Sequence, residues 1–128
     1  NVARVIYPTK YEGEIGKRAK KYLKGGYGGL VGIELKGGIE AGKKFIEALK
    51  MFYHVANIGD ARSLAIHPGS TTHSQLNEKE LLAAGVTPGY VRLAIGIEHI
   101  DDIIEDLEQA LNRASDNIEN IKKAKAVG

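Results

Sequence analysis

The sequence predicts a two-layer α/β sandwich, in which a small, mostly antiparallel sheet carries helices on one face. Apolar and polar residues alternate with the period of a strand over 30–35 and 90–98. Apolar residues recur at helical spacing over 39–53 and over the long stretch that begins at Ile100. Few strands among several amphipathic helices favour helices packed on one side of the sheet. The 128 residues suit a single domain with one modest core.

Three elements are expected in the first half of the chain. A helix is predicted over 12–24, because its acidic residues come early and its basic residues late, which matches the helix dipole. Gly25 and Gly26 end this helix. The strand over 30–35 and the helix over 39–53 follow.

Four elements are expected in the second half: a short strand over 63–66, a short helix from Asn77 to Gly85, the strand over 90–98 and a long final helix. Asn77 and Glu80 have the spacing of an N-cap and its capping-box partner. Asp101 and Asp102 near the start of the final helix, with lysines near its end, suit its dipole.

Arg92 lies in a strand whose two faces differ. One face is apolar, and the other holds Tyr90, Arg92, Ala94 and Gly96. The small residues beside the arginine leave an open floor that another molecule could approach. A guanidinium group is a rigid fork of donors suited to a carboxylate or a phosphate. We therefore interpret Arg92 as a candidate anion-binding residue, which should face water in the isolated chain. The alternative is an arginine that is only solvated and binds nothing.

Composition excludes several classes of function. The chain has no cysteine, which rules out disulfides, thiolate catalysis and thiolate metal sites. Its net charge of +2 gives no reason to expect a nucleic-acid or membrane partner. No apolar run approaches the roughly 20 residues that span a bilayer, so we expect a cytoplasmic protein. A chain that begins at Asn1 just before an apolar stretch is expected to be a piece of something longer.

Other motifs point to chemistry only weakly. His54, His67 and His73 lack a recognised metal-ligand spacing, so we expect loop histidines that bond to the backbone. Ser63 could be paired with one of them as a nucleophile and base, but such a pair is common by chance. The segment at 24–31 resembles an RNA-binding strand imperfectly, because it lacks the aromatic stacking residue.

Four ordered blocks resemble one enzyme family. They are AKKYL at 19–23, LKGG at 35–38, HVANIGDARSLAIHPGSTTHSQL at 54–76 and VRLAIGIE at 91–98. Together they are similar to the C-terminal end of the pyridoxal-phosphate-dependent enzymes of Cys/Met metabolism. The second and third blocks look most like the O-acetylhomoserine sulfhydrylase branch. Lyases of the family tend to have an acidic residue where this chain has Arg62.

The resemblance implies a longer enzyme of the fold-type I class, in which residues 1–128 form the small C-terminal domain. The missing large domain would bind pyridoxal phosphate, and the intact enzyme would be a homo-oligomer acting on a small amino-acid substrate. It would exchange the acetate of O-acetylhomoserine for sulfide or a thiol. By the same resemblance, Arg92 would bind the substrate α-carboxylate and Ser63 would assist.

Thr9-Lys10-Tyr11 mimics the sequence around the family's cofactor lysine, but the residues that follow do not match, so we reject Lys10 for that role. The isolated chain is therefore expected to be inactive and to bind no cofactor. Two alternatives remain open. One is another member of the family, such as a methionine or cystathionine γ-lyase or a cystathionine γ-synthase. The other is a free-standing α/β module that binds a ligand or RNA.

Overall fold

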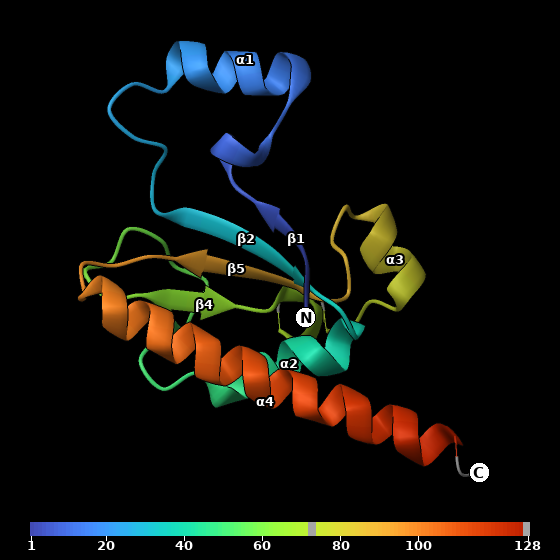
Figure 1. The fold of residues 1–128 in the computed structure, drawn as a ribbon. Helices are drawn as coiled ribbons and strands as arrows, with labels where there is room; N and C mark the ends of the chain where they lie inside the picture. The colour runs from blue at the N-terminus through green and yellow to red at the C-terminus, as the bar shows by residue number, and fades with distance from the viewer. Residues whose placement is uncertain (72–73, 127–128) are drawn as a thin grey trace.

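The computed structural model describes residues 1–71 and 74–126 as an α/β sandwich (Figure 1). In chain order, its elements are β1 (Val2–Ile6), the 3-10 turn η1 (Pro8–Lys10), α1 (Gly13–Tyr22), β2 (Leu30–Leu35), α2 (Gly38–Ala48), β3 (Tyr53–His54), β4 (Leu64–Ile66), the 3-10 turn η2 (Pro68–Ser70), α3 (Glu78–Ala83), β5 (Tyr90–Ala94) and α4 (Ile100–Ala126).

The sheet has five strands in the order β1-β2-β5-β4-β3. All neighbouring strands are antiparallel except β3 and β4, which are parallel. Arg92 on the central strand β5 lies opposite Gly32 of β2 on one side and Ile66 of β4 on the other. The predicted small and mostly antiparallel sheet is confirmed.

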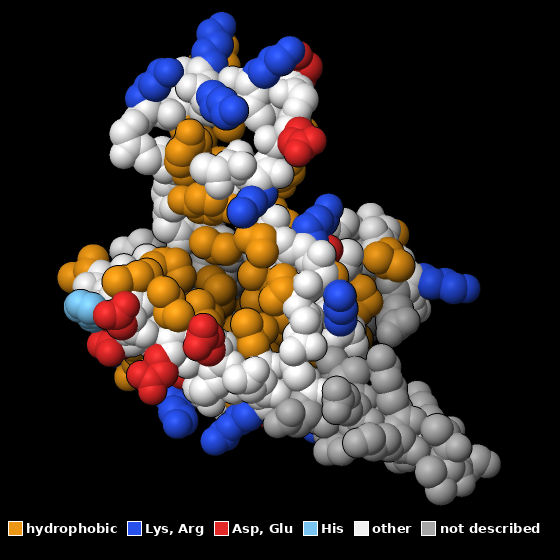
Figure 2. Space-filling model, viewed as in Figure 1, with side chains coloured by type: hydrophobic (Ala, Val, Ile, Leu, Met, Phe, Trp, Pro, Cys, Tyr) orange, Lys and Arg blue, Asp and Glu red, His pale blue; other side chains and the backbone are white. Residues whose placement is uncertain are grey.

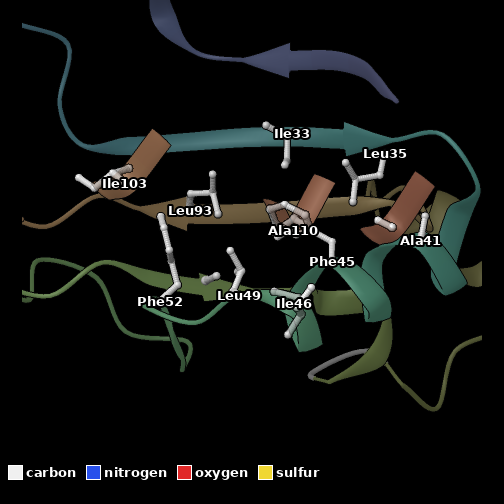
Figure 3. Packing of buried hydrophobic residues seen from close by; sticks show 14 residues of the cluster. Ile33, Leu35, Ala41, Phe45, Ile46, Leu49, Phe52, Leu93, Ile103 and Ala110 are labelled. Atoms are coloured by element: carbon white, nitrogen blue, oxygen red, sulfur yellow. The ribbon is translucent and has the colours of Figure 1, made fainter. Parts of the chain in front are cut away.

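The helices α2 and α4 pack against each other and cover one face of the sheet (Figures 1 and 3). Alternate strand residues point into this layer, as the period-two pattern predicts. The core contains residues from β2, α2 and the segment just after it, β4, β5 and α4, among them Ile33, Leu35, Phe45, Leu49, Ala65, Val91, Leu93, Ile103 and Ala110. Phe45 and Val91 are completely buried, which places the centre of the core between α2 and β5.

The helix α1 stands away from this sandwich (Figure 1). Its main contacts are with the turn η1, and Ile15 and Tyr22 remain 59% and 70% exposed. We call residues 7–29 the α1 arm. Figure 2 shows Lys and Arg side chains over the arm and a field of hydrophobic side chains on the face below it. The prediction that helices pack on one face of the sheet therefore holds for α2 and α4 but not for α1.

Two predicted elements end earlier in the structure, and one strand at the start of the chain was not predicted. The helix predicted over 39–53 ends at Ala48, and Tyr53 already belongs to β3. The strand predicted over 90–98 ends at Ala94, and Ile97 is 86% exposed rather than part of the apolar face. The apolar stretch that opens the chain forms an edge strand, β1, for which no strand was predicted, because its residues do not alternate.

The structure also confirms the capping box of α3. The side chain of Asn77 accepts a hydrogen bond from Glu80 N (3.0 Å), and Asn77 N donates to the Glu80 carboxylate (2.8 Å). Among the described residues, no helix combines the length and the apolar character needed to cross a membrane. The same residues contain no cluster of three or more His, Asp or Glu side chains that could hold a metal ion.

Candidate functional site

Arg92 lies on the face of β5 opposite the helices, as the alternation of the strand predicts. Its neighbours in sequence, Val91 and Leu93, are buried in the core, whereas Arg92 itself is half-buried. The loop between β3 and β4, residues 55–63, passes over this face. We call it the covering loop.

The covering loop binds the guanidinium group directly. One terminal nitrogen, Nη2, donates to the backbone carbonyls of Ala56 and Asn57. The side-chain Nε is buried and has no hydrogen-bond partner among the residues described. An arginine facing water in the isolated chain was expected to be paired with nothing essential, and that is wrong: the covering loop accepts two hydrogen bonds from Nη2, and the buried Nε is left over.

The open floor expected beside Arg92 is occupied as well. Ala94 is 6% exposed, and a Cβ atom at Gly96 would lie 2.4 Å from the carbonyl oxygen of Ala61. Ile97 N donates to that same carbonyl at 2.9 Å. The glycine therefore admits the chain's own covering loop rather than a second molecule.

Ser63 ends the covering loop and is completely buried. Its backbone N–H donates to Glu98 Oε1 (2.6 Å), and its hydroxyl donates to Glu98 Oε2 (2.8 Å). The hydroxyl oxygen accepts in turn from Gly96 N (2.9 Å). We call this group of bonds the Glu98 staple, because it joins the loop to the segment after β5.

The staple keeps Glu98 ionised. Burial alone would raise the pKa of this half-buried carboxyl group, but hydrogen bonds from the backbone and hydroxyl of Ser63 outweigh that effect. The net pKa is lowered from its ordinary value. Both carboxylate oxygens accept hydrogen bonds from Ser63, and an ionised carboxylate can only accept.

Arg62, next to Ser63 in the covering loop, is a second cation in this region. Its guanidinium lies over the ring of Tyr53, with Cζ 4.0 Å from the ring centroid. Its Nε is 3.9 Å from Asp60 Oδ1, and the side chain is 56% exposed. Arg62 is thus part of the covering loop, whereas Arg92 on β5 donates to the backbone carbonyls of that loop.

The histidines occupy different settings. His67 is completely buried: Nε2 donates to the Pro88 carbonyl (2.7 Å), so Nδ1 of the neutral ring accepts from the Ser70 hydroxyl (2.8 Å). Burial, with a smaller contribution from Lys43, lowers the pKa of His67. The backbone bond expected of a loop histidine is confirmed for His67. His54 is exposed on β3, and His73 lies outside the described residues.

Sequence reasoning missed two parts of this site. The carbonyls of Ala56 and Asn57 carry no side-chain signal at all. Glu98 was visible as the last residue of the fourth motif block, but its partner Ser63 is 35 positions away. The sequence showed an acidic residue at the end of the strand that carries Arg92. That observation did not identify Ser63 as the residue that Glu98 binds.

Comparisons with known proteins relate this chain to one family. A family model described as "Cys/Met metabolism PLP-dependent enzyme" matches residues 1–112. The chain is 62% identical over 94 residues to an O-acetyl-L-homoserine sulfhydrylase of Leptospira meyeri, covering 73% of this chain and 21% of that protein. It is 49% identical over 110 residues to a homocysteine synthase of Schizosaccharomyces pombe, covering 86% and 26%.

A solved structure agrees with the sequence relatives. A Campylobacter jejuni protein assigned as an O-acetylhomoserine (thiol)-lyase superposes with a TM-score of 0.75 at 42% identity. The match covers 87% of this chain and 26% of that one, which carries a pyridoxyl-lysine monophosphate. The chain belongs to the family of pyridoxal-phosphate-dependent enzymes of Cys/Met metabolism. It spans about a fifth to a quarter of the length of the relatives it matches.

Lys10 does not fit the role of the lysine that carries the cofactor. Lys10, the lysine of the TKY triplet, is exposed in the three-residue turn η1. A lysine that carries a cofactor must instead be enclosed with groups that hold the cofactor's phosphate and ring. The unpaired Nε–H of Arg92 is a single charged donor, which suits an oxygen of a carboxylate.

Proposed function

We propose that this chain is the small C-terminal domain of an O-acetylhomoserine sulfhydrylase and that it supplies the recognition of the substrate carboxylate. The intact enzyme would break the bond between Cγ and the acetate oxygen and form a new bond from Cγ to sulfide or a thiol. Acetate would leave, and homocysteine or methionine would be the product. Identity to relatives named for this activity supports the assignment.

Arg92 carries the proposal. Its Nη2 is already held by the covering loop, and its buried Nε is left without a partner among the residues described. A carboxylate that accepts from Nε would satisfy a donor that is otherwise costly to bury. Anchoring the carboxylate fixes the orientation of the substrate, which contributes to rate by positioning. Ser63 would assist from the end of the same loop.

The proposal leaves the cofactor chemistry to the preceding large domain. Pyridoxal phosphate, when bound, serves as an electron sink for the substrate carbons. The residues described here would bind and orient the amino acid. We propose further that the intact enzyme is cytoplasmic and a homo-oligomer, as the resemblance implies.

Kinetics of the intact enzyme test the role of Arg92. Arg92→Ala should lower kcat/KM for O-acetylhomoserine by roughly 30-fold to several thousandfold, because losing one partner of a buried charge pair costs about 2–5 kcal/mol. Arg92→Lys should recover only part of this loss, since an ammonium group makes no paired contact. Arg18→Ala, at an exposed arginine of α1, is the matched control.

A neutral substrate sharpens the test. The wild-type enzyme should discriminate against the carboxamide analogue of O-acetylhomoserine, and Arg92→Ala should lose that discrimination. If Arg92→Ala keeps kcat/KM within about threefold of wild type (roughly 0.7 kcal/mol), the proposal for Arg92 is wrong.

Substrate preference tests the activity itself. The intact enzyme should turn over O-acetylhomoserine in the presence of sulfide faster than O-succinylhomoserine or cystathionine. Faster elimination from cystathionine or methionine would instead place the enzyme among the lyases of the family.

A further inference from the structure

The two hydrogen-bond donors of Ser63 are both already used. A serine offers one backbone N–H and one hydroxyl proton, and both go to the carboxylate of Glu98, at 2.6 and 2.8 Å. The hydroxyl oxygen is occupied as well, because it accepts from Gly96 N. Ser63 therefore has no donor free for a substrate carboxylate while the Glu98 staple is intact.

The staple fixes the end of the covering loop. It binds Ser63 to the segment after β5, and the bond from Ile97 N to the Ala61 carbonyl (2.9 Å) fastens the residue two positions earlier. Gly96 permits this approach, since any side chain there would collide with the backbone at 61–62 and with the Glu98 carboxylate. These contacts thus fix the position of the loop end relative to β5.

The other part of the same loop holds Arg92. The carbonyls of Ala56 and Asn57 accept from Nη2 and determine which edge of the guanidinium stays available. The loop therefore connects two contacts with the β5 segment, one at Arg92 and one at Glu98. A shift of its stapled end would move the carbonyls that orient the arginine.

We propose that Glu98 is a positioning residue for carboxylate recognition: it holds Ser63 and the covering loop so that the loop carbonyls orient Arg92. On this proposal Ser63 assists indirectly, through Glu98, rather than as a ligand of the substrate. The inference rests on the proposed function of Arg92, and it assigns a role to a residue that does not touch the substrate. A misplaced guanidinium weakens binding even though its charge is unchanged.

Glu98→Gln in the intact holoenzyme is the primary test. The carboxamide keeps the shape of the side chain but replaces one acceptor oxygen with a donor, so a Ser63 donor loses its partner. We expect kcat/KM for O-acetylhomoserine to fall about tenfold to a hundredfold, mainly through KM, with the cofactor absorbance unchanged. Glu108→Gln, the same change at an exposed site on α4, should stay within about twofold.

Ser63→Ala is the milder second variant. It removes the hydroxyl and leaves the backbone bond to Glu98. If Glu98→Gln does not fold, Ser63→Ala alone decides: a lower kcat/KM together with faster exchange of the 55–63 amides supports positioning, and a lower kcat/KM with unchanged exchange overturns it. A positioning role predicts that Ser63→Ala and Glu98→Gln are strongly non-additive, and that Glu98→Gln adds little once Arg92 is alanine. If Ser63→Ala keeps its full effect in the Glu98→Gln background, Ser63 is a direct ligand and the proposal is wrong.

Amide exchange separates this inference from the proposed function. In Glu98→Gln the amides of residues 55–63 should exchange faster than in wild type, whatever Arg92 does. If Arg92→Ala leaves the kinetics intact, the proposed function fails, and faster exchange in Glu98→Gln would still establish the staple. If Arg92→Ala impairs the enzyme but Glu98→Gln leaves kcat/KM unchanged, Arg92 stands and the positioning role of Glu98 is overturned.

Discussion

Arg92 combines a structural role with the proposed binding role. Because Nη2 donates to two loop carbonyls, the side chain cross-links β5 to residues 36 and 35 positions earlier in the sequence. Ordinary surface arginines contribute little to stability. Two hydrogen bonds to the backbone of the covering loop make Arg92 different from those residues.

We therefore expect Arg92→Ala to lower the free energy of unfolding of the isolated chain by about 1 kcal/mol, the usual net worth of such bonds. Urea melts of the wild type and the variant measure this change. Arg18→Ala on the exposed side of α1 should shift the midpoint negligibly. A loss below about 0.3 kcal/mol for Arg92→Ala would show that the loop contacts do not hold the covering loop in solution.

His67 makes the stability of the chain dependent on pH. Burial favours the neutral form of the ring, and Gly42 of α2 provides the space, since a Cβ there would lie 2.3 Å from Nε2. The pKa of His67 is lowered in the folded state, mainly by burial. The unfolded chain therefore takes up a proton first as the pH falls.

The stabilisation linked to His67 is fully present above the pKa of an unfolded histidine, about 6.5, and decreases as the pH falls below it. The slope can reach about 1.4 kcal/mol per pH unit for one proton. Urea melts at pH 7.5, 6.5 and 5.5 should show this loss, and His67→Gln should be less stable but flatter over the same range. An unchanged slope in His67→Gln would assign the effect to another group.

The sequence was sufficient to single out Arg92 but insufficient to predict its surroundings. An arginine between Val91 and Leu93 on an alternating strand must point away from the core, and the structure confirms this. The covering loop could not be predicted, because its contacts are made by backbone carbonyls and by residues distant in sequence. Small residues beside an arginine predict that something approaches the strand closely. They do not show whether it is another molecule or, as here, a loop of the same chain.

At the scale of elements, α4 holds the end of α2. Asp106 is 6% exposed, and its carboxylate accepts from Lys50 N (2.9 Å) and Met51 N (2.8 Å) just beyond α2. Gln109 donates to the carbonyl of Ala48, one of the groups that a helix end leaves unpaired. Burial tends to raise the pKa of Asp106, but these backbone bonds prevail and lower it.

Asp106→Ala should destabilise the isolated chain by about 1–2 kcal/mol, because two partly buried backbone donors lose their acceptor. Asp106→Asn should lose less, since one oxygen remains. Asp102→Asn, at an exposed position one turn earlier on α4, is the matched control and should be nearly neutral. Equal melts for Asp106→Ala and Asp102→Asn would mean that the end of α2 needs no support from α4.

These contacts also explain which element boundaries the sequence predicts. The capping box at Asn77 is local, within three residues, and the prediction was correct. The end of α2 depends on Asp106, 56 positions from Lys50, while apolar residues such as Phe52 continue the helical spacing past it. A periodic pattern therefore extended the predicted helix to Tyr53, whereas tertiary contacts end it at Ala48.

At the scale of the whole molecule, the chain has a packed sandwich and a separate arm. The sandwich contains all residues of the core cluster, none of which comes from the α1 arm. The two ends of the arm are joined to each other by the Tyr7 hydroxyl, which donates to the Gly28 carbonyl at 2.8 Å, and by an edge-to-face contact between Tyr7 and Tyr27. Ile95 N donates to the Gly29 carbonyl at 2.8 Å and links the end of the arm to the segment after β5. Stability should accordingly differ between the two parts.

We expect the isolated chain to unfold cooperatively as a sandwich, with the arm contributing almost nothing. Phe45 in the sandwich is completely buried, and Ile15 in the arm is 59% exposed, so truncating each side chain reports on one of the two parts. Phe45→Ala should cost about 3–5 kcal/mol, whereas Ile15→Ala should cost no more than about 0.5 kcal/mol. Amides of α1 should likewise exchange far faster than those of α2.

The same pair of variants tests whether the arm is independent. If Ile15→Ala shifts the urea midpoint as far as a core truncation, or if α1 amides are protected to the global level, the arm packs on the sandwich in solution. Protection of α1 that arises only in the intact enzyme would instead show that the rest of the enzyme covers its apolar side. The isolated chain and the intact enzyme, measured under one set of conditions, distinguish these outcomes because only the second supplies new contacts to α1.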